Sequence, residues 1–197
     1  KENYDATLIG WATISGGETI PLDINLSNTT LQYCSGALTR NQLIADYNWS
    51  ITGDSFVCDE SDKFMMTWVT TSPNQSITIP TEGTGYDYTV EWGDGTSSNG
   101  NTGDTVHTYT TAGTYQVKIY GAFPRIYFSR FRASQALRSV DQWGSIHWRS
   151  MVAAFLGCTN LDVLATDAPD LSNVTSLFEM FTFCESLGTS SSLDLSG

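Results

Sequence analysis

The chemistry this sequence could perform begins with two acidic residues beside a Gly-Asp-Gly turn. Glu91 and Asp94 lie close together in the chain, and two carboxyl groups about 5 to 10 Å apart suffice to cleave a glycosidic bond. Asp94, however, occupies the turn itself, where an aspartate side chain ordinarily accepts backbone N–H groups. The chain also lacks the G-x-S-x-G signature of serine hydrolases. We therefore expect that the protein is not an enzyme.

Oxygen-bearing side chains are concentrated directly after this turn, in residues 94–104. Asp94, Asn99, Asn101 and Asp104 carry carboxylate and amide oxygens, and calcium takes six to eight oxygen ligands. Their spacing matches neither an EF-hand nor an RTX repeat, and Asn, Gly and Asp are also the ordinary residues of a long hairpin loop. A calcium site at these four residues and a plain hairpin connection both stay open, and no other cofactor is expected.

The segments around the turn alternate between apolar and polar side chains, which indicates half-buried antiparallel strands. Such alternation covers residues 64–68, 88–92 and 115–119. Gly and Pro residues separate the three segments, and several short strands at this spacing are typical of a small β-sandwich.

The segment at residues 1–60 has a different pattern. Leu43, Ile44 and Tyr47 form one apolar stripe and predict a helix over residues 37–47. The acidic run at residues 59–62 is interpreted as a linker to the strands.

An internal repeat follows the strands. Each apolar position of a first copy has a counterpart in a second copy whose residue number is higher by 26: Trp148, Met151, Phe155, Cys158 and Leu161 correspond to Val174, Leu177, Phe181, Cys184 and Leu187. The first four positions of each copy advance by 3, 4 and 3, which predicts a helix, and the residues that follow have the composition of a strand. A helix and a strand repeated at this period indicate a solenoid of the leucine-rich type.

The repeated apolar positions are expected to form the stacked core of this solenoid. The predicted core residues are Met151, Phe155, Cys158, Leu161, Leu177, Phe181, Cys184 and Leu187. Cysteines that are small and buried pack like apolar residues, so Cys158 and Cys184 are predicted to be free thiols.

The strand region resembles the PKD domain, whose pattern is a W-x-x-G-D-G-T turn and an H-x-Y…G-x-Y-x-V strand pair. The matching residues are Trp92, Gly93, Asp94, Gly95, His107, Tyr109, Gly113 and Tyr115. Trp92 directly precedes the Gly-Asp-Gly, which departs from the family's spacing. The resemblance implies a β-sandwich in which His107 packs and forms hydrogen bonds near the turn.

The repeat, with its M-x-x-x-F-x-x-C-x-x-L spacing, resembles the leucine-rich repeat of BspA-like bacterial surface proteins, which has the same period. Residues 1–58 are similar to the segment that caps such arrays, through residues 4–11, Tyr33-Cys34, Arg40 and residues 49–52. Cys34 and Cys58 bracket the helix of this capping segment. They are the expected disulfide pair, because a secreted chain meets an oxidising compartment.

The two resemblances together imply a mixed α/β fold of several modules. The expected modules are the cap of a preceding repeat array at residues 1–60, a PKD-like β-sandwich at 61–124 and an incomplete leucine-rich solenoid at 125–197. Because the cap precedes the array, we expect one permuted period, or a junction between two units, of a longer tandem protein.

Composition narrows the class of partner. The formal net charge of −12 lacks the positive field that nucleic acids and anionic membranes attract, and no apolar run approaches the roughly 20 residues that span a bilayer. Neither nucleic-acid binding nor membrane insertion is expected.

The expected function is that of a non-catalytic structural or adhesive segment of an extracellular bacterial cell-surface protein. It would act as a rigid spacer and a scaffold that binds glycans, extracellular proteins or neighbouring repeats of the same protein. Two alternatives stay open: an accessory carbohydrate-binding module of a secreted enzyme, and a ligand-free surface filament or gliding fibre.

Overall fold

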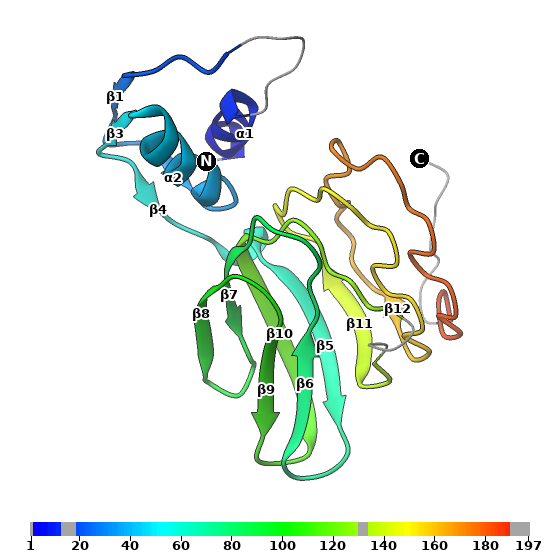
Figure 1. Ribbon diagram of the computed structural model, residues 1–197. Helices are drawn as coiled ribbons and strands as arrows, with labels where there is room; N and C mark the ends of the chain where they lie inside the picture. Colours follow the sequence, from blue (N-terminus) through cyan, green and yellow to red (C-terminus); the bar gives the residue numbers. More distant parts are fainter. Residues whose placement is uncertain (1, 13–18, 130–133, 190–197) are drawn as a thin grey trace.

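Residues 2–12, 19–129 and 134–189 are described by the computed structural model of the chain (Figure 1). The described part is rich in β-structure, and its two α-helices both precede the long strands. Strands β5 to β10 form two layers, the helices lie beyond one end of these layers, and the residues after β11 form a series of turns along one side.

The larger layer is a six-stranded sheet in the order β12-β11-β5-β10-β7-β8. Its strands are β5 (Phe64–Thr70), β7 (Asp87–Glu91), β8 (Ser97–Asn101), β10 (Gly113–Ala122), β11 (Leu137–Gln142) and β12 (Asp162–Val163). Strand β10 pairs antiparallel with both β5 and β7, and β11 pairs antiparallel with β5. The smaller layer is the antiparallel pair of β6 (Gln75–Ile79) and β9 (Thr105–Tyr109). We call residues 64–122 the two-layer body.

Alternation along the strands fills the space between the two layers. Tyr88 and Val90 of β7 and Val117 and Ile119 of β10 are buried, and they share one apolar core with Ile79 of β6. Successive side chains of a strand point to opposite faces, so the intervening polar residues face outward. The strands predicted around residues 64–68, 88–92 and 115–119 are thereby confirmed.

The segment before the two-layer body, residues 2–58, forms a second, smaller core. It contains α1 (Glu2–Ala12), α2 (Ala37–Tyr47) and two parallel strand pairs, β1 (Asn25–Ser27) with β3 (Ser50–Thr52) and β2 (Gln32–Tyr33) with β4 (Ser55–Phe56). The predicted helix at residues 37–47 is confirmed, and it ends at Asn48 in the left-handed conformation. Leu8 of α1 packs with Leu43 of α2 in this core, and both are fully buried.

The acidic run at residues 59–62 is more ordered than its interpretation as a linker implied. Residues Glu60–Asp62 form a short 3-10 helix, η1, and the Asp62 carboxylate accepts a hydrogen bond from the Asp59 N–H at 2.6 Å. Asp62 is itself buried. Two acidic residues that cap the turn reciprocally make the run a fixed junction.

The helix predicted in each repeat is wrong. The described residues after β11 form turns, bends and the short strand β12, and they contain no helix. In the first copy Ala153 and Gly157 have φ angles of 53° and 78°, and in the second copy Glu179 and Phe183 have 57° and 63°. A left-handed residue at every fourth position interrupts a right-handed helix, so the 3-4-3 spacing is met by successive turns instead. The strand composition after the first copy corresponds to β12.

The two copies share one backbone geometry and lie side by side. The hydrogen bonds from Ala154 N to Met151 O and from Cys158 N to Phe155 O recur at the equivalent positions of the second copy. Backbone hydrogen bonds also join the copies: Ala153 N to Phe178 O, Phe155 N to Met180 O and Gly157 N to Thr182 O, at 2.9, 2.9 and 2.8 Å. The repeat seen in the sequence is therefore also a repeat of conformation.

Candidate functional site

The Gly-Asp-Gly turn is held by a row of stacked rings. The His107 ring lies parallel to Trp92 at 4.8 Å between centroids, and its edge meets Tyr109 at 4.7 Å. Tyr109 in turn stacks on Tyr115 at 3.8 Å, and its hydroxyl donates to the Trp92 carbonyl at 2.7 Å. The row connects β9 and β10 to the end of β7, beneath the turn.

Glycines permit this close packing. Gly93 has a φ of 80°, and a Cβ there would lie 2.6 Å from the Gln116 carbonyl oxygen. Gly95 also has a positive φ, of 89°, and a Cβ at Gly113 would lie 3.2 Å from the Tyr115 ring. The turn and its rings thus bring together all eight residues of the predicted structural motif.

Asp94 serves the turn and is not paired with Glu91. Its carboxylate accepts hydrogen bonds from the Thr96 N–H at 3.0 Å and the Thr96 hydroxyl at 2.6 Å, and it contacts His107 Nε2 at 2.7 Å. Burial acts to raise the pKa of Asp94, but these hydrogen bonds outweigh it and hold the pKa below its usual value. Glu91 instead accepts from Lys63 Nζ at 2.9 Å. The two carboxylates therefore have separate partners, and no hydrogen bond links one to the other.

The predicted calcium ligands are not brought together. Residues 94–104 are not one loop, because β8 runs through them and pairs with β7. Asp94 precedes β8, whereas Asp104 follows it and accepts from the Thr81 N–H and hydroxyl. The Asn101 amide donates to the carbonyls of β7 and β8, and Asn99 is exposed. The calcium expectation is corrected, because an extended strand separates its end ligands, and the described residues contain no group of three or more His, Cys, Asp or Glu suited to a metal ion.

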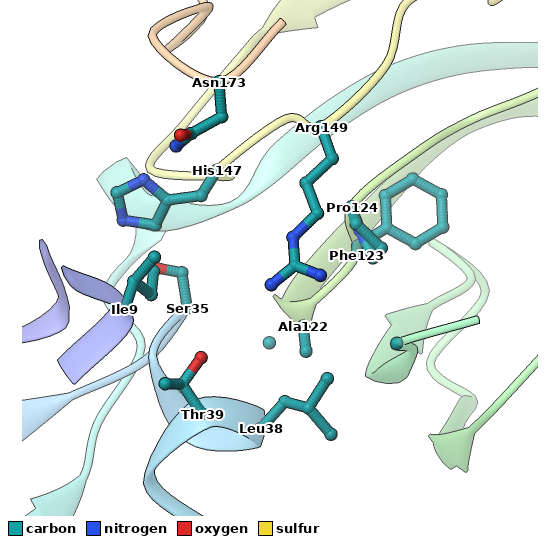
Figure 2. Close-up of a pocket in the computed structure, with 12 residues that line it drawn as sticks. Ile9, Ser35, Leu38, Thr39, Ala122, Phe123, Pro124, His147, Arg149 and Asn173 are labelled. Carbon is teal, nitrogen blue, oxygen red and sulfur yellow. The ribbon is translucent and has the colours of Figure 1, made fainter. Parts of the chain in front are cut away.

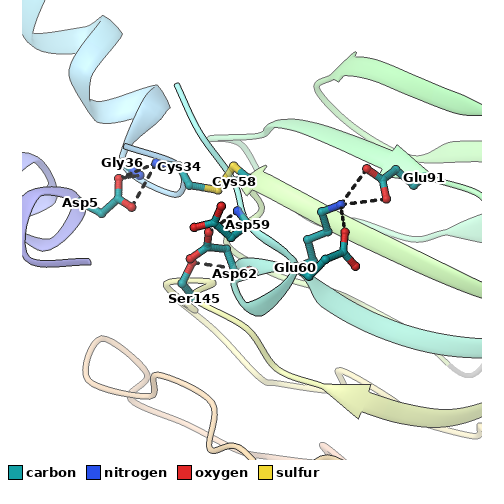
Figure 3. Close-up of a disulfide and its surroundings, with 10 residues drawn as sticks. Asp5, Cys34, Gly36, Cys58, Asp59, Glu60, Asp62, Glu91 and Ser145 are labelled. Atoms are coloured by element: carbon teal, nitrogen blue, oxygen red, sulfur yellow. Dashed lines mark hydrogen bonds and ion pairs between the residues drawn. A yellow bond between two sulfur atoms is a disulfide. The ribbon is translucent and has the colours of Figure 1, made fainter. Parts of the chain in front are cut away.

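A disulfide ties the start of α2 to the start of the two-layer body. The predicted bond between Cys34 and Cys58 is confirmed (Figure 3). Beside it, the buried Asp5 carboxylate accepts from the N–H groups of Cys34 and Gly36, both at 2.9 Å. Burial raises the pKa of Asp5, and the backbone N–H bonds oppose the rise. Asp5 thus fixes α1 against the start of α2, and the disulfide fixes the start of α2 against the residues that lead into the two-layer body.

An ion-pair cluster continues from this junction onto the outer face of the large sheet. Lys63 is buried, contacts both Glu60 and Glu91, and lies over the Tyr120 ring at 5.2 Å from its centroid. Burial alone would lower the pKa of Lys63, but the two carboxylates raise it above its usual value. On its other side this junction accepts from Gln142, whose amide donates to the carbonyls of Glu60 and Lys63 at 2.7 and 2.8 Å.

A column of aromatic rings runs from the two-layer body through both repeats. Trp68 of β5 lies 6.1 Å from Phe128, Phe128 lies 6.2 Å from Phe155, and Phe155 lies 5.5 Å from Phe181. The last three rings are stacked within 23° of parallel. Phe128 precedes Phe155 by nearly one period of the repeat, so it stands where a preceding copy would place its phenylalanine.

Burial differs between the two copies of the repeat. Met151, Phe155, Cys158 and Leu161 of the first copy are fully buried. In the second copy, Phe181, Cys184 and Leu187 are half-buried and pack against the same core. Both cysteines are free thiols, as predicted, and Cys184 Sγ donates to the Phe155 carbonyl at 3.1 Å.

The prediction of Leu177 as a core residue is wrong, since 51% of its surface is exposed. Met151, at the equivalent position, lies in the copy between the two-layer body and the second copy. In the part of the chain that the structure describes, Leu177 has a neighbouring copy on one side and is left open on the other.

The three parts of the chain meet at a small cavity of about 30 Å³ (Figure 2). Ile9 and Ser35 line it from the first segment, Ala122 from the end of the two-layer body, and His147 and Arg149 from the start of the repeats. A space of this size holds about one water molecule, so the cavity is not a substrate pocket. His147 is partly buried and contacts Asp170 at 2.6 Å.

A larger cavity of about 420 Å³ lies between α1 and the β1-β3 pair. Its walls are mainly apolar, and Asp54 is the acidic residue in its lining. The Asp54 carboxylate is already engaged by Arg40 Nε and Nη2 at 2.7 and 2.6 Å and by the Tyr4 hydroxyl at 2.9 Å. The Arg40 hydrogen bonds hold the pKa of Asp54 below its usual value. This carboxylate is a structural anchor between α1, α2 and the end of β3.

Sequence reasoning missed Phe128, Lys63 and Asp5. The sequence did contain a signal for Phe128, because its distance from Phe155 is only one residue longer than the period of the repeat. The partners of Lys63 and Asp5 lie far from them in the chain, and no local pattern reports such contacts.

No family model matches the chain, and no curated protein or solved structure matches it either. Among the described residues, neither helix is long and apolar enough to cross a membrane.

Proposed function

We propose that the chain is a non-catalytic, rigid spacer segment of an extracellular surface protein. The observation that carries this proposal is the aromatic column from Trp68 to Phe181, with one apolar core that extends from the two-layer body into the repeats. Modules that share a core resist bending at their junction, whereas modules on a flexible linker move independently. A column of this kind supports a role in holding other parts of a protein at a fixed distance and angle.

The junctions of the first segment support the same role. The Cys34–Cys58 disulfide, the Lys63 cluster and the Gln142 hydrogen bonds fix residues 58–63 from both sides. A disulfide is typical of an oxidising compartment, which supports an extracellular location. The net charge of −12 keeps such a segment soluble at an exposed surface.

The partner of the second repeat is, on this proposal, a further copy of the same repeat. Leu177 and Phe178 are 51% and 66% exposed on its outer side, whereas their first-copy counterparts Met151 and Val152 are buried and half-buried. Large adjacent apolar side chains on a surface mark a site of association. A PKD-like body and a leucine-rich solenoid, as the sequence resemblances imply, are the family assignments that suit this arrangement.

The proposal is tested by removing one ring of the column. Phe128→Ala deletes a fully buried ring and should lower the free energy of unfolding by about 3 to 5 kcal/mol, because it separates Trp68 from Phe155. Phe178→Ala removes the same side chain from the exposed position and is the matched control, with a change of about 0.5 kcal/mol or less. Urea unfolding of both variants measures the difference. Equal, small effects would show that the column does not join the two parts.

A further inference from the structure

A groove of about 230 Å³ lies between the first segment and the outer face of the large sheet. Tyr33, Asn41 and Phe56 line it from β2, α2 and β4, and Asp87 and Tyr120 line it from β7 and β10. The helices lie beyond the end of the two layers from which β4 leads into β5 (Figure 1). The groove is smaller than the roughly 300 to 1,000 Å³ pockets that hold drug-sized ligands, and it suits a single six-membered ring.

Polar groups in this groove are left without hydrogen-bond partners from the protein. The hydroxyls of Tyr33, Thr89 and Tyr120, the Asn41 amide and the Asp87 carboxylate form no side-chain hydrogen bond with any residue that the structure describes. The carboxylates of Asp54, Asp94 and Asp104, by contrast, are engaged by protein partners. These convergent donors and acceptors are available to a ligand that carries several hydroxyl groups.

The aromatic side chains supply the apolar half of the groove. Tyr33 and Phe56 form a tilted pair at 5.7 Å, and 48% of the Phe56 surface is exposed. Arg40 lies over Tyr33 at 4.9 Å, and Lys63 lies over Tyr120. These cations orient the two tyrosine rings from one side and leave Phe56 as the exposed aromatic surface.

We propose that this groove binds one ring of a neutral saccharide. A pyranose ring has an apolar face of C–H groups and an edge of hydroxyls. The exposed Phe56 ring would pack against that face, and the Asp87 carboxylate and Asn41 amide would hydrogen-bond the edge. The Asp87 charge and the overall acidity of the chain disfavour an anionic sugar.

This site is separate from the aromatic column, so it adds a recognition function to the spacer. Both sides of the groove are needed, because Phe56 comes from the first segment and Asp87 from the two-layer body. The fixed junction at residues 58–63 therefore also holds the two halves of the site in place.

The test uses the full chain and saturation-transfer NMR with cellotriose, chitotriose and mannotriose as probes, each up to about 20 mM. At least one probe should bind with a dissociation constant between about 0.1 and 10 mM, the weak range expected when one ring is held. Absence of transfer to all three probes would overturn the proposal.

Variants then locate the binding. Phe56→Ala and Asp87→Asn should each weaken it by about tenfold. Val106→Ala and Asp46→Asn are the matched controls, since Val106 is 61% exposed on β9 and Asp46 is exposed on α2, and they should leave it unchanged. Asp87→Asn keeps the size of the side chain and so remains informative if Phe56→Ala fails to fold. Binding that survives Asp87→Asn unchanged would place the saccharide elsewhere and contradict the assignment.

Discussion

At the scale of single residues, several charged groups of this protein are engaged in structure. Asp54 shows it most clearly, because its side chain is 2% exposed and two nitrogens of Arg40 hold it. Asp94 has the same role at the turn through Thr96 and His107. Carboxylates that are held by fixed partners in this way stabilise the fold.

The Asp54 anchor predicts a stability that depends on acid. The pKa of Asp54 is lower in the folded chain than in the unfolded one, so its contribution is present above the unfolded value of about 3.9 and is lost as the pH falls through the folded value. We expect Asp54→Asn to cost about 2 to 4 kcal/mol at pH 7 and to flatten the fall in stability below pH 4. Urea unfolding between pH 2 and pH 7 measures both effects, with Asp46→Asn as the exposed control. A steep acid dependence that persists unchanged in Asp54→Asn would contradict this role.

The two thiols predict slow chemical modification. Burial raises the pKa of Cys158 to about 12 and that of Cys184 to about 11, and the thiolate is the reactive form. At pH 8 the folded protein should therefore react with iodoacetamide at least about a hundredfold more slowly than the urea-unfolded protein. Mass spectrometry counts the modified thiols. Complete modification of the folded protein at the unfolded rate would show that the column around Phe155 is open.

At the scale of elements, the junction at residues 59–63 depends on Gly144. Gly144 has a φ of 66°, and a Cβ on it would collide with the carbonyl groups of Asp62 and Lys63. Gly83 has a similarly positive φ, of 91°, but a Cβ there would meet nothing within 4 Å. Substitution of both glycines by alanine therefore separates the cost of the left-handed conformation from the cost of the steric clash.

Gly144→Ala should lower the free energy of unfolding by about 3 kcal/mol or more, and Gly83→Ala by about 1 to 2 kcal/mol, the cost of a left-handed alanine alone. Thermal unfolding of the two variants gives the comparison. If the two substitutions have the same effect, the contact between Gly144 and η1 does not hold the junction.

The elements also show what the sequence can and cannot predict. The helix at residues 37–47, the strands β5, β7 and β10 and the Cys34–Cys58 pair were predictable from pattern, resemblance and compartment, and the structure confirms them. The helix in the repeat failed because Ala153, Glu179 and Phe183 adopt left-handed φ angles that apolar periodicity does not report. The calcium site failed because a polar run, Ser97–Asn101, pairs as a strand.

The candidate saccharide groove lay beyond sequence reasoning for a related reason. Phe56 and Asp87 are brought together by the path of the chain through the disulfide and η1, and neither residue carries a local signal. Tyr120 is an evident aromatic residue of a strand, but Lys63, which lies over its ring, is distant from it in the sequence.

At the scale of the whole molecule, the two-layer body and the repeats form one continuous structure. The large sheet extends through β11 and β12 beyond the two-layer body, and the aromatic column joins the same parts. Backbone hydrogen bonds link these parts in two steps: Val69 N of the two-layer body donates to Ala136 O just before β11, and Phe128 N, after the body, donates to Ala154 O of the first repeat. A rigid spacer requires this continuity.

Native-state hydrogen exchange tests that continuity most directly. The amides of Val69, Phe128 and Leu164 form hydrogen bonds that link the two-layer body, β11 and the repeats. They should open with the same free energy as the amides of the central strand β10, because one body unfolds as a unit. Amides of the repeats that open several kcal/mol more easily than those of β10 would show two independent bodies, and would contradict the proposal of a rigid spacer.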